Sequence, residues 1–276
     1  MFDATPATPG HALHQDPSFA AALSLCGQAP VTLPGGLILL HRKLAGIPVA
    51  MLPRADPPPD LLAQLKDVGL SRIPLILSPE RPLGHMRALR LRKGISTAII
   101  DLQQSDTVRR AALHQKWRNQ LCRAEASLLR VTSASLKPDH ILLSLNEDQA
   151  RKRGYANWPA PLTAAFASTA PDQTRLFTAS LNGTKVAHML FLRHGHRATY
   201  HIGHSTQQGR AHHAHNLLLW TASCWLAVRG STSLDLGLLN DSTPSHTRFK
   251  LRAGARPQLM GGTWLRWHPL ARKAGT

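Results

Sequence analysis

The chain has few of the features that mark secreted or membrane-spanning proteins. Its three cysteines, Cys26, Cys122 and Cys224, are odd in number and far apart, which predicts reduced thiols and no disulfide framework. It has no run of about 18 apolar residues, so we expect no membrane-spanning helix. Residues 1–10 lack a basic segment followed by an apolar one, so no signal peptide is expected. These absences together predict a cytoplasmic protein.

Acidic residues are also scarce, and the scarcity is uneven. The sequence has 33 Lys and Arg against 15 Asp and Glu, a net charge of +18 with His neutral. Residues 105–276 carry +15 of this excess, and no acid falls between Asp172 and Asp235 or after Asp241. This favours a polyanionic partner: a nucleotide cofactor, RNA, or an anionic membrane surface in peripheral contact. The alternative is compositional, with arginine replacing lysine on a solvated surface in an Ala- and Arg-rich bacterial proteome.

The length and the 43% hydrophobic content allow one large core or two smaller ones, and two lobes are favoured. We expect an abbreviated mixed α/β lobe over residues 1–104, made of short elements separated by turns. The expected elements are a helix near residues 19–26, a hairpin of residues 36–40 and 47–52, a helix over 61–68, a strand over 73–77 and a second hairpin of 86–91 and 95–102.

Residues 105–276 predict a second domain that begins with one long helix, Ser105 to about Leu129. Apolar residues recur there at intervals of three and four, and Arg109, Lys116, Arg123 and Arg130 form a basic stripe. A further helix ends at Gly154, and Asn182-Gly183 is a strong hairpin signal. From residue 175 to a last strand over residues 258–267, the expected order is β-β-β-α-β-α-β.

Several short motifs in this second domain could carry chemistry. They are Lys116–Glu125 in the long helix, the strand Ala198–Gly203, the turn Thr206–Ala211, the strand Leu234–Gly237, and Phe249-Lys250 followed by Gly254. A glycine-bearing turn that opens a helix can bind an anion, because its backbone N–H groups are unpaired. The alternative is an ordinary turn in which Gly209 supplies a positive φ.

In order and spacing these motifs resemble the GNAT acyltransferase superfamily, and more narrowly its FemAB-like branch, where a long helix joins two GNAT-related lobes. The resemblance covers residues 105–276 well and residues 1–104 only in topology. It implies an α/β fold with a mixed (α+β) sheet, in which a complete C-terminal GNAT lobe follows the abbreviated N-terminal one.

The resemblance also implies where an acyl donor would bind. The strand Tyr200–Gly203 would splay from Leu234–Gly237, and its free backbone groups would hold the pantetheine arm or ester of the donor. The glycine turn departs from the family pattern in having Thr206 where Gln or Arg is usual. A glycine in either strand could instead mark a bulge. The implied donor-binding residues are Gly203, Gln208, Gly209, Arg210, Ala211 and Gly237.

Lys250 is the leading candidate for catalysis, because the family's Phe-Lys signature places this lysine at the reaction centre. A fixed cation there could stabilise a tetrahedral oxyanion, whereas the alternative is an ordinary surface lysine. Tyr200 and Asp235 complete the candidate catalytic set, although Asp235 could instead pair with a buried basic group. The candidate substrate-binding residues are Arg118, Asn119 and Phe249.

Histidine is abundant, with 16 residues, eight of them between His188 and His215. No Cys pair, His-Glu-x-x-His motif or nearby carboxylate completes a coordination sphere, so we expect no metal. Either His201 or His204 could accept a proton from an attacking amine.

The sequence therefore predicts an N-acyltransferase that moves an acyl group from acyl-CoA, such as acetyl-CoA, to a substrate amine by direct attack. One alternative is a FemAB-type transferase that uses aminoacyl-tRNA and acts on a cell-wall or peptide amine. Another is a non-catalytic RNA-binding protein that has kept a GNAT fold, since a fold alone does not establish activity.

Overall fold

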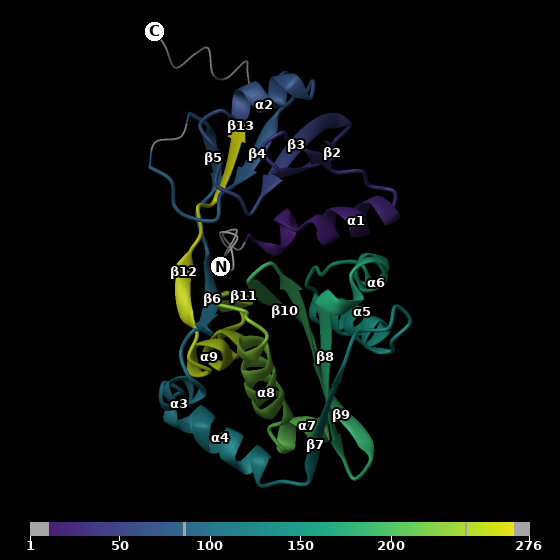
Figure 1. Ribbon diagram of the computed structural model, residues 1–276, viewed down its shortest axis with the longest axis vertical. Helices are drawn as coiled ribbons and strands as arrows, with labels where there is room; N and C mark the ends of the chain where they lie inside the picture. The colour runs from purple at the N-terminus through teal and green to yellow at the C-terminus, as the bar shows by residue number, and fades with distance from the viewer. Residues whose placement is uncertain (1–10, 85–86, 241, 268–276) are drawn as a thin grey trace, which may run out of the picture. The chain divides into compact units, whose positions relative to one another are not determined.

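The computed structural model describes residues 11–84, 87–240 and 242–267, which divide into two compact units. Of these residues, one unit holds 11–13 and 98–257, and the other holds 14–97 and 258–267. Each unit has a sheet of its own (Figure 1). The expected domains, 1–104 and 105–276, differ from this division because the chain returns at residue 258 to the unit in which it began.

The unit of residues 14–97 and 258–267 is built on a six-stranded mixed sheet. In spatial order its strands are β1 (Val31–Thr32), β2 (Ile38–Leu44), β3 (Ile47–Pro53), β4 (Leu75–Ser78), β13 (Thr263–Arg266) and β5 (Leu89–Arg92). The 3-10 turn η1 (Leu13–Gln15) leads into α1 (Pro17–Leu25), and α2 (Leu61–Asp67) connects β3 to β4. Leu39, Leu52 and Leu77 are buried at the centre of its core.

The predicted hairpin of residues 86–91 and 95–102 is wrong. Its start at residue 86 lies outside the described residues, while β5 and β6 (Ser96–Asp101) belong to different sheets. β5 pairs instead with the returning strand β13. The chain before β13 passes so close that a side chain on Gly94 would overlap the Met260 carbonyl. Gly94 therefore marks a close approach of two backbones, which a sequence pattern cannot distinguish from a hairpin turn.

The unit of residues 98–257 is built on a seven-stranded mixed sheet. In spatial order its strands are β12 (Arg256–Leu259), β6, β11 (Ser233–Leu238), β10 (Arg197–Ser205), β9 (Thr184–His194), β8 (Thr174–Leu181) and β7 (Leu129–Ala134). Its helices are α3 (Asp106–Ala111), α4 (Gln115–Glu125), α5 (Leu142–Arg153), α6 (Ala160–Thr169), α7 (Gln207–Ala211), α8 (Ala214–Val228) and α9 (Pro244–Arg252), with a 3-10 turn η2 (Pro171–Gln173). The predicted fold class, an α/β fold with a mixed (α+β) sheet, is confirmed.

Strands β7 to β10 form an antiparallel meander, and α7 and α8 carry the chain to β11, which lies parallel to β10 (Figure 1). The β8–β9 hairpin turns at Asn182-Gly183 as predicted, and both residues have positive φ (50° and 82°). Apolar residues of α8, among them Leu218 and Leu226, are fully buried against this sheet. The buried apolar face of α8 therefore fixes the connection between β10 and β11.

The predicted long helix, Ser105 to Leu129, is wrong, because the chain forms α3 and α4 with a break between them and then enters β7. His114 causes the break: its Nδ1 accepts from the Lys116 N–H at 3.2 Å and caps α4. Its own N–H donates to the Arg252 carbonyl at 3.1 Å. The predicted basic stripe is split as a result, since Arg109 is buried on α3 and Arg130 lies on β7.

Candidate active site

Strands β10 and β11 separate after a short paired stretch. They pair only at Arg197–Ser233, Ala198–Leu234 and Thr199–Asp235, although β10 continues to Ser205 and β11 to Leu238. A bulge interrupts the pairing of β10 with β9 between Tyr200 and Ile202. Bulges bend a strand and increase its twist, and this one coincides with the end of the β10–β11 pairing. We call the two segments that are not paired with each other, 200–205 and 236–238, the wedge.

Side chains from three helices hold the end of β10. Gln149 of α5 donates from Nε2 to the Gly203 carbonyl at 3.2 Å, and Arg210 of α7 donates from Nη1 to the Ser205 carbonyl at 2.6 Å. His215 of α8 has its Nε2 3.0 Å from the His204 carbonyl. Because β9 pairs with this segment through Ser205, and α5, α7 and α8 also bind it, the segment keeps its position without a β11 partner.

On the β11 side the structure brings together Asp235, Gly237 and Lys250. The buried Asp235 carboxylate accepts from the Gly237 N–H at 2.7 Å, and Gly237 has φ +82°, a conformation that favours glycine. Lys250 of α9 donates from Nζ to the Leu238 carbonyl at 2.8 Å. Its Nζ lies 3.7 Å from where a side chain on Gly237 would begin. The ammonium group thus lies at the unpaired end of β11.

The surroundings of Lys250 weaken its hold on a proton. Burial lowers the pKa of the Lys250 amine below its ordinary value, and the Asp235 carboxylate opposes that shift. The side chain is half-buried, with one hydrogen bond to a carbonyl. An ammonium group has three donor hydrogens, so two remain for a ligand.

Tyr200 and Gly203 form a pair within β10. The Tyr200 hydroxyl occupies the place that a side chain on Gly203 would take, so the glycine makes room for the phenol. Burial raises the pKa of Tyr200, which keeps the phenol protonated at neutral pH. Its ring packs against Phe191 with centroids 5.7 Å apart. Tyr200 is therefore a neutral group at the start of the wedge, directly after the last paired residue, Thr199.

In the glycine turn Thr206–Ala211, a side chain of the turn already bonds one of the backbone N–H groups. Thr206 caps α7, with its hydroxyl accepting from the Gly209 N–H at 3.1 Å. Gly209 does not have a positive φ, so the alternative in which this glycine supplies one is wrong. Gly209 instead makes room for the backbone, because a side chain there would overlap the Val186 carbonyl. Gln208 and Ala211 are exposed on α7. Thr206, the departure from the family pattern, thus takes one N–H that an anion would otherwise bind.

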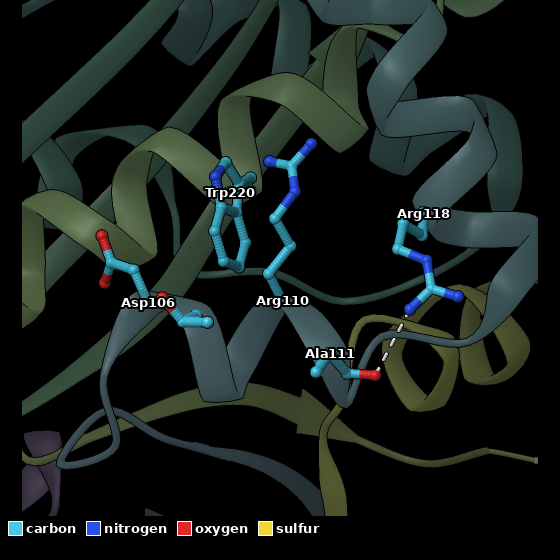
Figure 2. A pocket seen from close by; sticks show the side chains of 6 residues that line it. Asp106, Arg110, Ala111, Arg118 and Trp220 are labelled. Carbon is cyan, nitrogen blue, oxygen red and sulfur yellow. Dashed lines mark hydrogen bonds between the residues drawn. The ribbon is translucent and has the colours of Figure 1, made fainter.

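The predicted substrate-binding residues lie apart from the residues of the wedge. Arg118 lines an open pocket of about 380 Å³ with Arg110 and Trp220, and donates from Nη1 to the Ala111 carbonyl at 3.5 Å (Figure 2). Asn119 is exposed on α4. Phe249 packs on Trp117 with ring centroids 6.0 Å apart, next to Lys250 in sequence. No residue of the wedge lines the Arg118 pocket.

Sequence reasoning missed His246, which precedes Lys250 by one helical turn on α9. Burial lowers the pKa of His246, and the nearby positive charges of Arg153 and Lys250 lower it further. The pKa of His204 is also lowered, by burial and then by Arg210 and Arg153. His201, at the bulge, lies with Nε2 3.0 Å from the Thr163 hydroxyl. The four-residue spacing between His246 and Lys250 is too common on helices to select this histidine from the sequence.

His188 on β9 is buried and neutral at neutral pH. Burial lowers the pKa of His188 to about 4, and its ring contacts that of His140 with centroids 5.5 Å apart. Within the described part of the chain, no group of three or more His, Cys, Asp or Glu side chains could hold a metal ion. In the same residues no helix is long and apolar enough to span a bilayer.

Residues 105–251 match the family model of the acetyltransferase (GNAT) domain. The chain belongs to the GNAT family. This membership supports an acyltransferase activity, and the two-sheet fold is also found in solved structures.

Three solved structures resemble this GNAT protein over nearly its whole length. FemX has a TM-score of 0.73 and 12% identity, covering 96% of this chain and 95% of its own. The C-terminal domain of a putative lysylphosphatidylglycerol synthetase from Agrobacterium fabrum has a TM-score of 0.58 and 14% identity, covering 95% of this chain and 92% of its own. L-PGS from Bacillus licheniformis has a TM-score of 0.58 and 12% identity, covering 94% of this chain and 87% of its own. At such identities the likeness concerns the fold alone. No curated protein sequence matches the chain.

Proposed function

We propose that this protein is an N-acyltransferase that binds an activated acyl donor in the wedge and transfers the acyl group directly to an amine. The observation that carries the proposal is the loss of β10–β11 pairing after Thr199 and Asp235. Backbone groups at a sheet edge bind an extended chain by strand addition. The groups that would do so here are those that remain, because side chains already bond the carbonyls of 203–205 and Leu238 and the Gly237 N–H. A slender amide-bearing arm, such as the pantetheine arm of CoA, fits that mode of binding.

Lys250 supplies the charge that this reaction requires. Attack of an amine on a thioester or ester carbonyl creates a negative oxygen, and a fixed cation stabilises it most where water is partly excluded. The Leu238 carbonyl and the packing of Phe249 on Trp117 fix the position of Lys250. The amine proton passes to a neutral base, for which His204 and His246 are candidates because their pKa values are lowered. Collapse of the tetrahedral intermediate then breaks the C–S or C–O bond of the donor, and the leaving CoA or tRNA takes up that proton. Tyr200 and Asp235 shape the two strands.

We propose acyl-CoA as the donor and aminoacyl-tRNA as the second candidate. CoA suits the narrow, unpaired strand ends of the wedge. The second candidate is favoured by the Thr206 cap, because the Gly209 N–H is already bound and less available to a pyrophosphate. The charge of +18 also suits an RNA-borne donor. In either case the acceptor is a primary amine.

The first test replaces Lys250 with alanine and measures acyl transfer. Wild-type protein is incubated with labelled acetyl-CoA, or separately with labelled alanyl-tRNA, and a panel of amines that includes lysine, spermidine and a lysyl peptide. We expect wild-type product with one donor and a loss of about 100- to 1,000-fold in kcat for Lys250→Ala, because an oxyanion donor is removed.

The matched control is Lys137→Ala, which removes an exposed lysine from the loop between β7 and α5 and should leave the rate unchanged. Circular dichroism should show both variants folded, because Lys250 makes one partly exposed hydrogen bond, worth about 1 kcal/mol. Equal transfer by wild type and Lys250→Ala would remove the proposed role. Absence of transfer from both donors, with salt-sensitive RNA binding, would favour the non-catalytic alternative.

A further inference from the structure

A cavity of about 360 Å³ lies within the unit of residues 98–257, and no residue of the wedge lines it. Its wall comes from β6, α3, α4, α8 and the segment after α9. Ile100, Val108 and Leu219 give it an apolar side. Cavities of a few hundred Å³ with apolar walls and a few polar groups are typical of small-molecule sites.

Two side chains in this wall have buried donor groups without acceptors. Arg109 is 7% exposed, and no described residue accepts from its Nε or Nη1. Trp117 is 2% exposed, and its Nε1 likewise has no acceptor among the described residues. A buried donor that has lost water without gaining an acceptor costs about 1–3 kcal/mol. Two such side chains in the wall of one cavity point to a missing acceptor.

The number of donor hydrogens indicates the chemistry of that acceptor. Nη1 of Arg109 carries two hydrogens, Nε carries one, and the Trp117 indole adds a fourth. Nη2 of Arg109 is already paired with Asp106. Because Nε and Nη1 lie on opposite edges of the guanidinium, one carboxylate cannot accept from both. It can accept from one of them and from the Trp117 N–H, and it brings no donor of its own. A hydroxyl or an amide would bring donors of its own.

The charges and aromatic groups of the wall fit the same ligand. Arg109 and Arg256 line the cavity together with one acid, Asp101, whose carboxylate already accepts from the Gln103 N–H at 2.9 Å. The Arg109 guanidinium also lies 5.6 Å from the Trp220 ring centroid, which restricts its rotation. The Arg109 guanidinium is thus held in place beside the apolar side of the cavity.

We propose that this cavity binds a small organic carboxylate, with its oxygens on Arg109 and Trp117 and its apolar body against α3 and α8. Such a ligand would also adjoin the helix that carries Lys250, because Ala253 and Gly254 line the cavity directly after α9. The proposal concerns a second site and does not depend on the acyl-transfer function.

The test is calorimetric titration of the full chain with sodium hexanoate, and with hexanamide as a neutral probe of the same shape. We expect saturable binding of one hexanoate per chain, and hexanamide at least about 10-fold weaker because it lacks the charge. Arg109→Met should weaken hexanoate about 10- to 100-fold. Arg110→Met is the matched control: Arg110 neighbours Arg109 and lies 5.5 Å from the same indole, but it lines the other pocket (Figure 2). It should change binding by less than about 3-fold.

Two further variants make the test independent of how Arg109→Met folds. Trp117→Phe keeps an aromatic ring but removes the five-membered ring with its N–H, so hexanoate should bind several-fold more weakly. Ser223→Leu places a larger side chain on the α8 wall and should abolish binding, while the thermal transition stays single. The proposal is overturned if hexanoate gives no saturable heat, if hexanamide binds equally well, or if Trp117→Phe and Ser223→Leu both bind like wild type.

Discussion

At the scale of single residues, the role of each side chain in the site depends on its neighbours. Asp235 was a candidate for catalysis from its place in the sequence, and in the structure it holds the Gly237 N–H and opposes the loss of the Lys250 proton. Lys250 could be selected from the Phe-Lys motif. His246 could not, because a histidine on a short amphipathic helix is common and only its position beside Lys250 makes it notable.

The lowered pKa of Lys250 leads to a prediction about alkaline pH. The lysine is a cation below its folded pKa, and it loses that charge as the pH rises through a value lower than the ordinary 10.5. Asp235→Asn should keep the hydrogen bond to Gly237 but remove the charge that favours the cation. We therefore expect the alkaline decline of kcat to move to lower pH in Asp235→Asn. A decline at unchanged pH would show that Lys250 does not set it.

At the scale of elements, the predictions succeed where local chemistry decides and fail where distant segments meet. The Asn182-Gly183 hairpin and α8 follow from turn chemistry and from apolar spacing. The break between α3 and α4 depends on a histidine cap and on a bond to Arg252, which helical periodicity does not reveal. The sequence raised a bulge only at the strand glycines, whereas the bulge in β10 lies between Tyr200 and Ile202, where no residue type marks it.

The β10 geometry can be tested with a double-mutant cycle at Tyr200 and Gly203. Gly203→Ala should lower stability by about 1–3 kcal/mol, since the new methyl group meets the Tyr200 hydroxyl. In a Tyr200→Phe background the same change should cost less, because the hydroxyl is gone. Gly84→Ala is the control, with open space around it and no positive φ. Additive effects of Tyr200→Phe and Gly203→Ala in urea unfolding would contradict this reading of the contact.

At the scale of the whole molecule, the sequence predicted a GNAT-like domain with a second lobe, and the family comparison confirms the family. The exchange of strands between the two units could not be predicted. β13 follows β12 by three residues, yet it pairs with β4 and β5 in the other unit. Strand pairing across such sequence distances depends on the register of both sheets, and a short apolar run does not specify its partner.

The measurement that tests the account most directly is a map of backbone amide shifts while a donor is titrated into labelled protein. CoA is titrated first, and a short aminoacylated RNA hairpin second. The account predicts saturable shifts for one of them at Ile202–Ser205 and Leu236–Gly237, with little change in β7 and β8. Saturation by either donor at other residues only, or shifts from neither donor at these two segments, would contradict it.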